Sequence, residues 1–299
     1  MRVVIAGGSG FLGRALAMRL ADDGHEVRVL TRRPREPHDV AWSPEGGAAD
    51  WTVEIAGADA VINLAGEPIA AGRWTAARRA AIRSSRRHAT KALVAAMQAV
   101  PRAPRVFVSS SAVGIYGDRG DEPLTEDSAP GSDFLAKVCV EWEQAARGAA
   151  DQTRVVLVRT GLVLARHGGA LPRLALPFWS YLGGRLGSGR QYVSWIALED
   201  WTAMIAWALG RDAASGPMNA TAPEPVTNAA FARTLGMVIR RPSRMPAPAF
   251  ALRLALGDMS EALLAGQRAL PAMAQALGFE FRYPSLEPAL RAIYSSSAE

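Results

Sequence analysis

Three glycines near the start of the chain have the spacing of a nucleotide-binding turn. Gly7, Gly10 and Gly13 follow a short apolar run at residues 3–6, and apolar residues then recur with helical period. The first glycine allows a tight turn, the second lets the backbone approach a pyrophosphate, and the third lets the helix pack on the strand, with phosphate charge at the helix N-terminus. The alternative is a turn with a purely steric role. The residues expected to contact a dinucleotide here are Gly7, Ser9, Gly10, Phe11, Leu12 and Gly13.

The residues after the second predicted strand, 26–30, indicate which dinucleotide binds. A dinucleotide site usually has an acid at this place to bind the ribose 2′-hydroxyl, but the chain has Thr31, Arg32 and Arg33. An acid would repel a 2′-phosphate, whereas a guanidinium binds it bidentately and stacks on adenine. We therefore expect NADP(H) rather than NAD. The alternative is that Arg32 and Arg33 are solvated surface charges.

Two further predicted strands end where a cofactor would lie. The segment 59–66 is a buried strand that ends in small residues, and 105–111 is the next strand. Ligands of open α/β sheets bind at the carboxyl edge of the strands. Cofactor contacts are therefore expected from Asn63, Leu64, Ala65, Gly66 and Ser109, although Ala65 and Gly66 could simply turn the chain.

The alternation of strands and helices predicts the α/β class, with a Rossmann doubly wound parallel sheet and a smaller, interleaved C-terminal substrate lobe. The length of 299 residues suits this arrangement better than two independent domains. We expect an NADP-binding domain at 1–165, to which 197–222 returns. The substrate lobe would occupy 166–299 and include a small C-terminal domain at about 243–290. The polar segment 34–50 is predicted to be a loop with one short strand, and 167–189 to be a Gly- and Pro-rich stretch.

Composition excludes several classes of function. The net charge is +6, but the arginines are dispersed without a nucleic-acid-binding motif, so the charge favours an anionic cofactor or phosphorylated substrate instead. No apolar run reaches the roughly 18 residues of a membrane span, and no signal-peptide pattern is present. We expect a cytoplasmic monomer or homodimer with a small-molecule substrate and with neither nucleic acid nor membrane as a partner.

Cysteine and histidine usage gives no sign of a disulfide or a metal site. Cys139 is the only cysteine, so no intrachain disulfide can form, in keeping with a reducing compartment. The four histidines are scattered without the spacing of metal ligands.

Several motifs together resemble those of the extended short-chain dehydrogenase/reductase superfamily: GGSGFLG at the N-terminus, DAVINLAG, SSSAVGIYG and GSGRQYVSWI. INLAGEPI, LLAGQRALP and GFEFRYPSLEPAL are similar to signatures of one branch, the epimerase-family proteins with a small C-terminal domain of unknown function. The resemblance covers essentially the whole chain. It implies an NADP-binding Rossmann domain and a smaller C-terminal lobe, but no particular substrate.

The superfamily uses a Tyr-x-x-x-Lys motif, and in this chain the same spacing falls on Asp133 and Lys137. The resemblance implies that Lys137 holds the nicotinamide ribose and that Ser111 polarises the substrate oxygen, while the usual acid/base tyrosine is missing. Tyr116 is the nearest phenol, or a wall of the substrate cleft. An Asp133 carboxylate beside Lys137 would accept a proton readily but donate one poorly. The candidate catalytic residues are thus Ser111, Tyr116, Asp133 and Lys137.

The C-terminal lobe is expected to determine the substrate. Tyr192 and Trp195 could form pocket walls, and Arg185 and Arg190 could bind an anionic group, although most aromatic residues in such a lobe are core. Glu67, in the INLAGEPI motif, completes the substrate candidates. Relatives in the same branch commonly have histidine where this chain has Ala197, so any role of that histidine does not transfer.

Three functions remain open from the sequence. The preferred one is an NADP-dependent oxidoreductase that acts on a small carbonyl, a hydroxyl or a nucleotide-sugar-like substrate. A sugar-nucleotide epimerase would also have to retain the oxidised intermediate. The third is an NADPH-binding sensor with little or no turnover, which the combination of an intact glycine turn and a changed catalytic motif would suit.

Overall fold

The computed structural model describes residues 1–45 and 51–295. Its centre is a seven-stranded sheet in the order β11-β7-β5-β4-β1-β2-β3, in which every neighbouring pair is parallel. The strands are β1 (Arg2–Ala6), β2 (Glu26–Thr31), β3 (Asp39–Ala41), β4 (Ala60–Asn63), β5 (Val106–Ala112), β7 (Arg154–Thr160) and β11 (Gly216–Ala220). The chain order reverses between β1 and β4, and a doubly wound sheet binds its ligand at that switch point.

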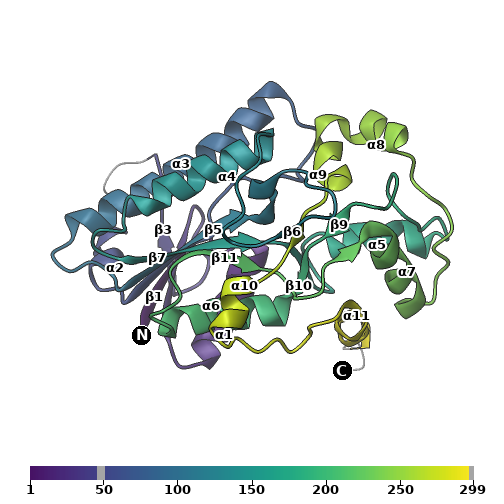
Figure 1. Cartoon of the computed structure of the whole chain (residues 1–299). Coiled ribbons are helices and arrows are strands. Elements are labelled where there is room, and N and C mark those ends of the chain that lie inside the picture. The colour runs from purple at the N-terminus through teal and green to yellow at the C-terminus, as the bar shows by residue number, and fades with distance from the viewer. Residues whose placement is uncertain (46–50, 296–299) are drawn as a thin grey trace.

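Helices cover both faces of the sheet (Figure 1). α1 (Phe11–Asp22) and α6 (Leu198–Gly210) pack on the face that carries Val3 and Ile5. α2 (Thr52–Ala56), α3 (Ala76–Ala99) and α4 (Phe134–Arg147) lie on the other face, toward which Val4 and Ala6 point. Burial on both faces explains why the strands are continuous apolar runs rather than alternating ones.

The connection from β2 to β3 contains no helix. Parallel neighbours are normally joined through a crossover of a dozen or more residues, usually helical, but here residues 32–38 suffice. Pro34 and Pro37 lie in this segment and disfavour a helix. The face of β2 beside α1 therefore remains uncovered, and it forms part of the groove described below. Residues 46–50, the last five of the predicted loop at 34–50, lie outside the described part of the chain.

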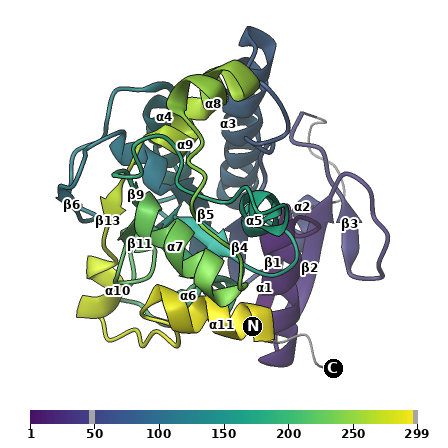
Figure 2. The ribbon, with the colours of Figure 1, turned by 90° about the vertical axis from the view of Figure 1, so that its right-hand side faces the viewer.

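A smaller lobe is built from the C-terminal third and from insertions between the strands (Figures 1 and 2). Its helices α5 (Leu171–Trp179), α7 (Asn228–Val238) and α11 (Leu286–Ser295) share one apolar core. The other helical elements outside the main sheet layers are η1 (Val113–Tyr116), α8 (Ala249–Leu256), η2 (Gly257–Ser260), α9 (Glu261–Leu264) and α10 (Ala272–Ala276). Three two-stranded pairs complete the structure: β6 (Pro123–Leu124) and β13 (Arg268–Ala269), β8 (Leu162–Leu164) and β10 (Trp195–Ala197), and β9 (Tyr192–Val193) and β12 (Val226–Thr227).

The Rossmann fold with an interleaved smaller lobe is confirmed. β11 comes after much of the lobe in sequence, yet it pairs with β7 at the edge of the main sheet. Residues 167–189 were expected to be an irregular Gly- and Pro-rich stretch, but part of this segment forms the helix α5. It forms because Pro172 lies in the first turn, where proline is tolerated, and because Leu171, Ala175 and Phe178 recur with helical period and are buried.

Candidate cofactor and active site

The glycine turn requires glycine at two places for steric reasons. Gly7 has φ +79°, and a Cβ on it would lie 2.8 Å from the backbone nitrogen of Ala65. A Cβ on Gly13 would lie 2.5 Å from the carbonyl oxygen of Gly7 and would push α1 away from the turn. The first turn of α1 has no acidic residue, and its N-cap residue is Gly10, which has no side chain to form a capping bond. Its backbone amides are therefore available to an anion.

The loop after β4 meets this turn. Asn63 is fully buried, and its side chain links two elements: Nδ2 donates to Thr90 Oγ1 at 2.8 Å, and Oδ1 accepts from the backbone nitrogen of Ala65 at 3.1 Å. Asn63 thus shapes the loop 64–66 rather than facing a ligand with its side chain. Leu64 and Ala65 lie against Gly7, so the structure brings the two predicted cofactor segments together.

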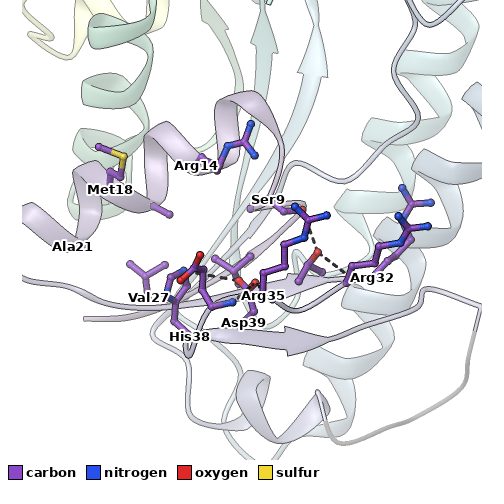
Figure 3. A pocket seen from close by; sticks show the side chains of 15 residues that line it. Ser9, Arg14, Met18, Ala21, Val27, Arg32, Arg35, His38 and Asp39 are labelled. Carbon is purple, nitrogen blue, oxygen red and sulfur yellow. Dashed lines mark hydrogen bonds and ion pairs between the residues drawn. The ribbon is translucent and has the colours of Figure 1, made fainter. Parts of the chain in front are cut away.

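A groove of about 960 Å³ runs from the glycine turn along the uncovered face of β2 (Figure 3). Val27 and Val29 form its floor, and Ala17 and Met18 of α1 form one wall. Four arginines line it, and all of them are exposed: the predicted Arg32 and Arg33, together with Arg14 of α1 and Arg35. The four guanidinium groups outnumber the two carboxylates of the groove, Glu36 and Asp39, so its lining favours an anionic group such as a phosphate.

Thr31 takes the place of the usual acid at the end of β2. Its side chain is buried, and its Oγ1 lies 3.1 Å from Ser9 Oγ, so the structure joins these two predicted residues. The Thr31 hydroxyl also accepts a long hydrogen bond from the backbone nitrogen of Arg33, at 3.4 Å. The end of β2 thus has a hydroxyl in place of a carboxylate. Asp39, which also lines the groove, accepts hydrogen bonds from the backbone nitrogens of Arg35 and Glu36, at 2.8 and 3.1 Å.

A buried polar network lies beneath the carboxyl edge of β5 and β7. Ser111 Oγ donates to Glu143 Oε1 at 2.8 Å, and Arg159 forms two hydrogen bonds to Glu143, at 2.9 and 3.0 Å. Arg159 also donates to Tyr116 Oη at 3.0 Å, and Tyr116 donates to Asn219 Oδ1 at 2.7 Å. These five side chains come from five different elements: β5, α4, β7, η1 and β11.

The network engages both hydroxyl groups that the sequence singled out. Ser111 is 4% exposed and Tyr116 is fully buried. The single proton of each hydroxyl is used within the network. Burial raises the pKa of the Tyr116 phenol above its ordinary value, despite the nearby Arg159. Burial would lower the pKa of Arg159, but the hydrogen bonds and charge of Glu143 raise it, so this guanidinium stays protonated.

Asp133 and Lys137 lie at the start of α4. Asp133 is the N-cap residue: its Oδ1 accepts from the backbone nitrogen of Ala136 at 2.8 Å, which satisfies a free helix amide. Lys137 is one turn further along the helix and is exposed. The carboxylate therefore has a structural use that is independent of any chemistry, whereas the ammonium group is available to a ligand.

The predicted substrate residues differ in their surroundings. Glu67 forms an ion pair with Arg78 at 2.6 Å. Trp195 is fully buried in the core of the lobe, where its Nε1 donates to the carbonyl oxygen of Glu224 at 3.0 Å. Tyr192 is half-buried beneath Arg268, with 5.3 Å between the guanidinium carbon and the ring centroid. Arg185 and Arg190 are exposed.

Ser109, predicted to contact the cofactor, is fully buried, and among the described residues its hydroxyl has no partner.

Sequence reasoning missed Glu143, Arg159 and Asn219, as well as Arg14 and Arg35. A signal was present for the first two. Glu143 follows Ala136 and Cys139 at helical spacing, so it lies on the buried side of α4, and Arg159 interrupts an apolar strand. Two opposite charges at buried positions imply a pair.

Within the described residues, 1–45 and 51–295, no group of His, Cys, Asp or Glu side chains has the arrangement of a metal site. No helix in this part of the chain is long and apolar enough to cross a membrane.

The chain was compared with known proteins. Residues 3–220 match the NAD dependent epimerase/dehydratase family, and residues 247–293 match a domain of unknown function. Epimerase family protein YfhF of Bacillus subtilis is 41% identical over 97% of both chains. The human epimerase family protein SDR39U1, crystallised with NADPH, has a TM-score of 0.91 and 35% identity over 99% of both chains. A nucleoside-diphosphate sugar epimerase of Corynebacterium glutamicum has a TM-score of 0.79 and 37% identity, covering 97% of this chain and 57% of that one. This chain therefore belongs to the NAD dependent epimerase/dehydratase family, carries a C-terminal domain of unknown function, and has the Rossmann fold of short-chain dehydrogenase/reductase proteins.

Proposed function

We propose that this chain binds NADP(H) at the carboxyl edge of its sheet and is an NADP-dependent oxidoreductase that acts on a small carbonyl or hydroxyl compound. The observation that carries the proposal is the groove lined by four exposed arginines beside Thr31, where an NAD site would have an acid. The human relative crystallised with NADPH supports this choice of cofactor.

The residues present fit the two charged parts of such a cofactor. The pyrophosphate would lie at the N-terminus of α1, where Gly7 and Gly13 allow backbone segments to approach closely and the first turn of the helix has no acidic side chain. Arg32 and Arg33 would bind the 2′-phosphate, and Arg14 and Arg35 line the same groove. Lys137 would donate hydrogen bonds to the nicotinamide ribose.

The bound cofactor would supply hydride transfer, and the protein would position the substrate oxygen and move a proton. Ser111 Oγ donates its only proton to Glu143. Toward a substrate it can therefore act as an acceptor, for example from a hydroxyl group, unless that hydrogen bond breaks. Tyr116 is fully buried and bound at its hydroxyl, so in this arrangement it supports Arg159 rather than meeting a substrate.

The second candidate is an NADPH-binding sensor with little turnover. It is favoured by the same network, because the two hydroxyls that could serve a carbonyl both have buried partners. Epimerisation is a third reading, and the Corynebacterium glutamicum protein carries that name. Simple oxidation or reduction demands less of the site, because no oxidised intermediate has to be retained and turned over.

A turnover assay separates these candidates. NADPH oxidation would be followed with a panel of carbonyl compounds, for the original protein and for Ser111→Ala and Lys137→Ala. Lys91→Ala, which changes an exposed lysine on α3, is the matched control. An enzyme should lose activity in the first two variants and keep it in the control. Tight NADPH binding without turnover of any compound would support the sensor.

A further inference from the structure

Most of the large apolar side chains that the described residues leave exposed lie in the C-terminal lobe. Eight of them belong to two segments, 176–182 and 237–254, and the most exposed are Phe250 at 72% and Leu254 at 78%. Figure 2 shows α5, α7 and α8 on the side of the molecule that faces the viewer. The eight residues are Leu176, Trp179, Tyr181, Leu182, Met237, Met245, Phe250 and Leu254.

The helix α8 is unusual among these elements. Its sequence, AFALRLAL, is almost wholly apolar, yet none of its residues is buried. Phe250 and Leu254 are one turn apart on its outer side, next to the exposed Arg253. A short helix derives most of its stability from packing an apolar face. Within the described residues, this outer side of α8 has no such packing.

The two segments meet at the loops that follow α5 and precede α8. The backbone nitrogen of Met245 donates to the carbonyl oxygen of Gly183 at 3.1 Å, and Leu186 and Ala247 form a bridge. Arg241 joins them further, because its guanidinium carbon lies 5.2 Å from the Trp179 ring centroid and 5.0 Å from that of Tyr181. We call residues 176–182 together with 237–254 the apolar–basic face.

The charge on this face has one sign. The chain holds 28 acidic residues in 299, but none lies in 152–198 or in 225–257. Arg240, Arg244 and Arg253 are exposed among the apolar side chains. The first acid after α8, Asp258, forms an ion pair with Arg79. A surface of apolar side chains, aromatic rings and uncompensated arginines is complementary to negatively charged lipid.

We propose that the apolar–basic face binds the surface of an anionic lipid bilayer. Phe250 and Leu254 would enter the boundary between headgroups and acyl chains, while Trp179 and Tyr181 would lie at headgroup level. The arginines would contact lipid phosphates. A protein partner is less well matched, because protein interfaces place the fully buried apolar core apart from the charged rim. The proposal departs from the expectation of no membrane partner, which depended on the lack of an apolar span, because peripheral binding requires no membrane-spanning helix. It does not depend on the cofactor proposal.

Vesicle sedimentation tests the proposal with the full chain. The vesicles would contain phosphatidylcholine alone or phosphatidylcholine with phosphatidylglycerol. We expect binding only to the anionic vesicles, with affinity falling about five-fold for each arginine charge removed. Phe250→Gln with Leu254→Gln tests apolar insertion, and Arg244→Glu with Arg253→Glu tests the charge. Both double variants should bind at least about ten-fold more weakly.

Matched controls are available elsewhere on the surface. Val53→Gln changes a side chain that is 67% exposed on α2, and Arg102→Glu reverses an exposed charge after α3. Both should leave vesicle binding within about two-fold of the original. No binding to anionic vesicles at low salt, or equal losses in the controls and in the double variants, would overturn the proposal. An acidic protein that binds this face while vesicles do not would also overturn it.

Discussion

Glu143 and Arg159 are the charged residues that hold the centre of the candidate active site together. Their side chains are 6% and 7% exposed, and between them they engage Ser111 and Tyr116. Two buried charges are costly to desolvate, and they are compatible with a stable fold only while paired and hydrogen-bonded. The network therefore positions the hydroxyl groups and, for the same reason, makes its members difficult to replace singly.

A double-mutant cycle measures this dependence. Glu143→Leu leaves the Arg159 charge buried without its partner and should lower the free energy of unfolding by about 3–5 kcal/mol. Glu143→Leu combined with Arg159→Met should lose less than the sum of the two single changes, by about 2 kcal/mol or more. Urea denaturation followed by tryptophan fluorescence gives these values. Strict additivity would show that the pair is not energetically coupled.

Cys139 offers a second test at the residue scale. It is buried, and burial raises the pKa of its thiol to about 11. Since the raised pKa favours the neutral thiol, the thiolate fraction at pH 8 should be roughly 100-fold below that of an ordinary cysteine. Iodoacetamide labelling followed by mass spectrometry should leave the native protein unmodified and label it in urea. Rapid labelling of the native protein would contradict the buried placement. Because Cys139 is the sole cysteine, the measurement has one site.

At the scale of elements, the start of α4 shows how one residue can look catalytic for a structural reason. Asp133 occupies the tyrosine position of the Tyr-x-x-x-Lys spacing, but its carboxylate caps the helix that carries Lys137. Asp is a favoured N-cap residue, which is why the helix begins here. The sequence could not show that the Ser111 hydroxyl is hydrogen-bonded to Glu143 in the network beneath this helix.

Substitution at the cap distinguishes its two roles. Asp133→Ala should lower the free energy of unfolding by about 1 kcal/mol, whereas Asp133→Asn should keep nearly all of it, because Asn caps as well as Asp. If capping is the only role, NADPH binding and any turnover in Asp133→Asn should equal those of the original protein. A large loss of turnover in Asp133→Asn at unchanged stability would instead assign the carboxylate to proton transfer.

At the scale of the whole molecule, the sequence predicted the parallel sheet well and the lobe less well. β4 lies within the strand expected at 59–66, because a buried parallel strand is a continuous apolar run. α5 was missed because Pro172 and Pro177 suggested an irregular segment, and its stability comes from tertiary burial. Trp195 was expected at a pocket, but whether an aromatic side chain faces a core or a cleft depends on elements distant in sequence, here α5 and α7.

The glycine turn was the most predictable feature of the molecule because its conformation depends on a short segment of the chain. The glycine turn and the residues after β2 are each a short segment whose spacing has a steric or electrostatic cause. Glu143, Arg159 and Asn219 meet only after three elements have packed, so no spacing along the chain connects them.

Comparing NADPH and NADH affinity in Arg32→Ala combined with Arg33→Ala tests whether the arginines of this groove bind the 2′-phosphate of NADP(H). Fluorescence titration would give both dissociation constants, with Arg102→Ala as the control for an exposed arginine elsewhere. Loss of the charge-assisted hydrogen bonds to the 2′-phosphate should weaken NADPH binding by about 10-fold to 100-fold, and NADH binding much less, because NADH has the adenine but no 2′-phosphate. Unchanged NADPH affinity, or an equal fall for both dinucleotides, would contradict the assignment of this groove to NADP(H).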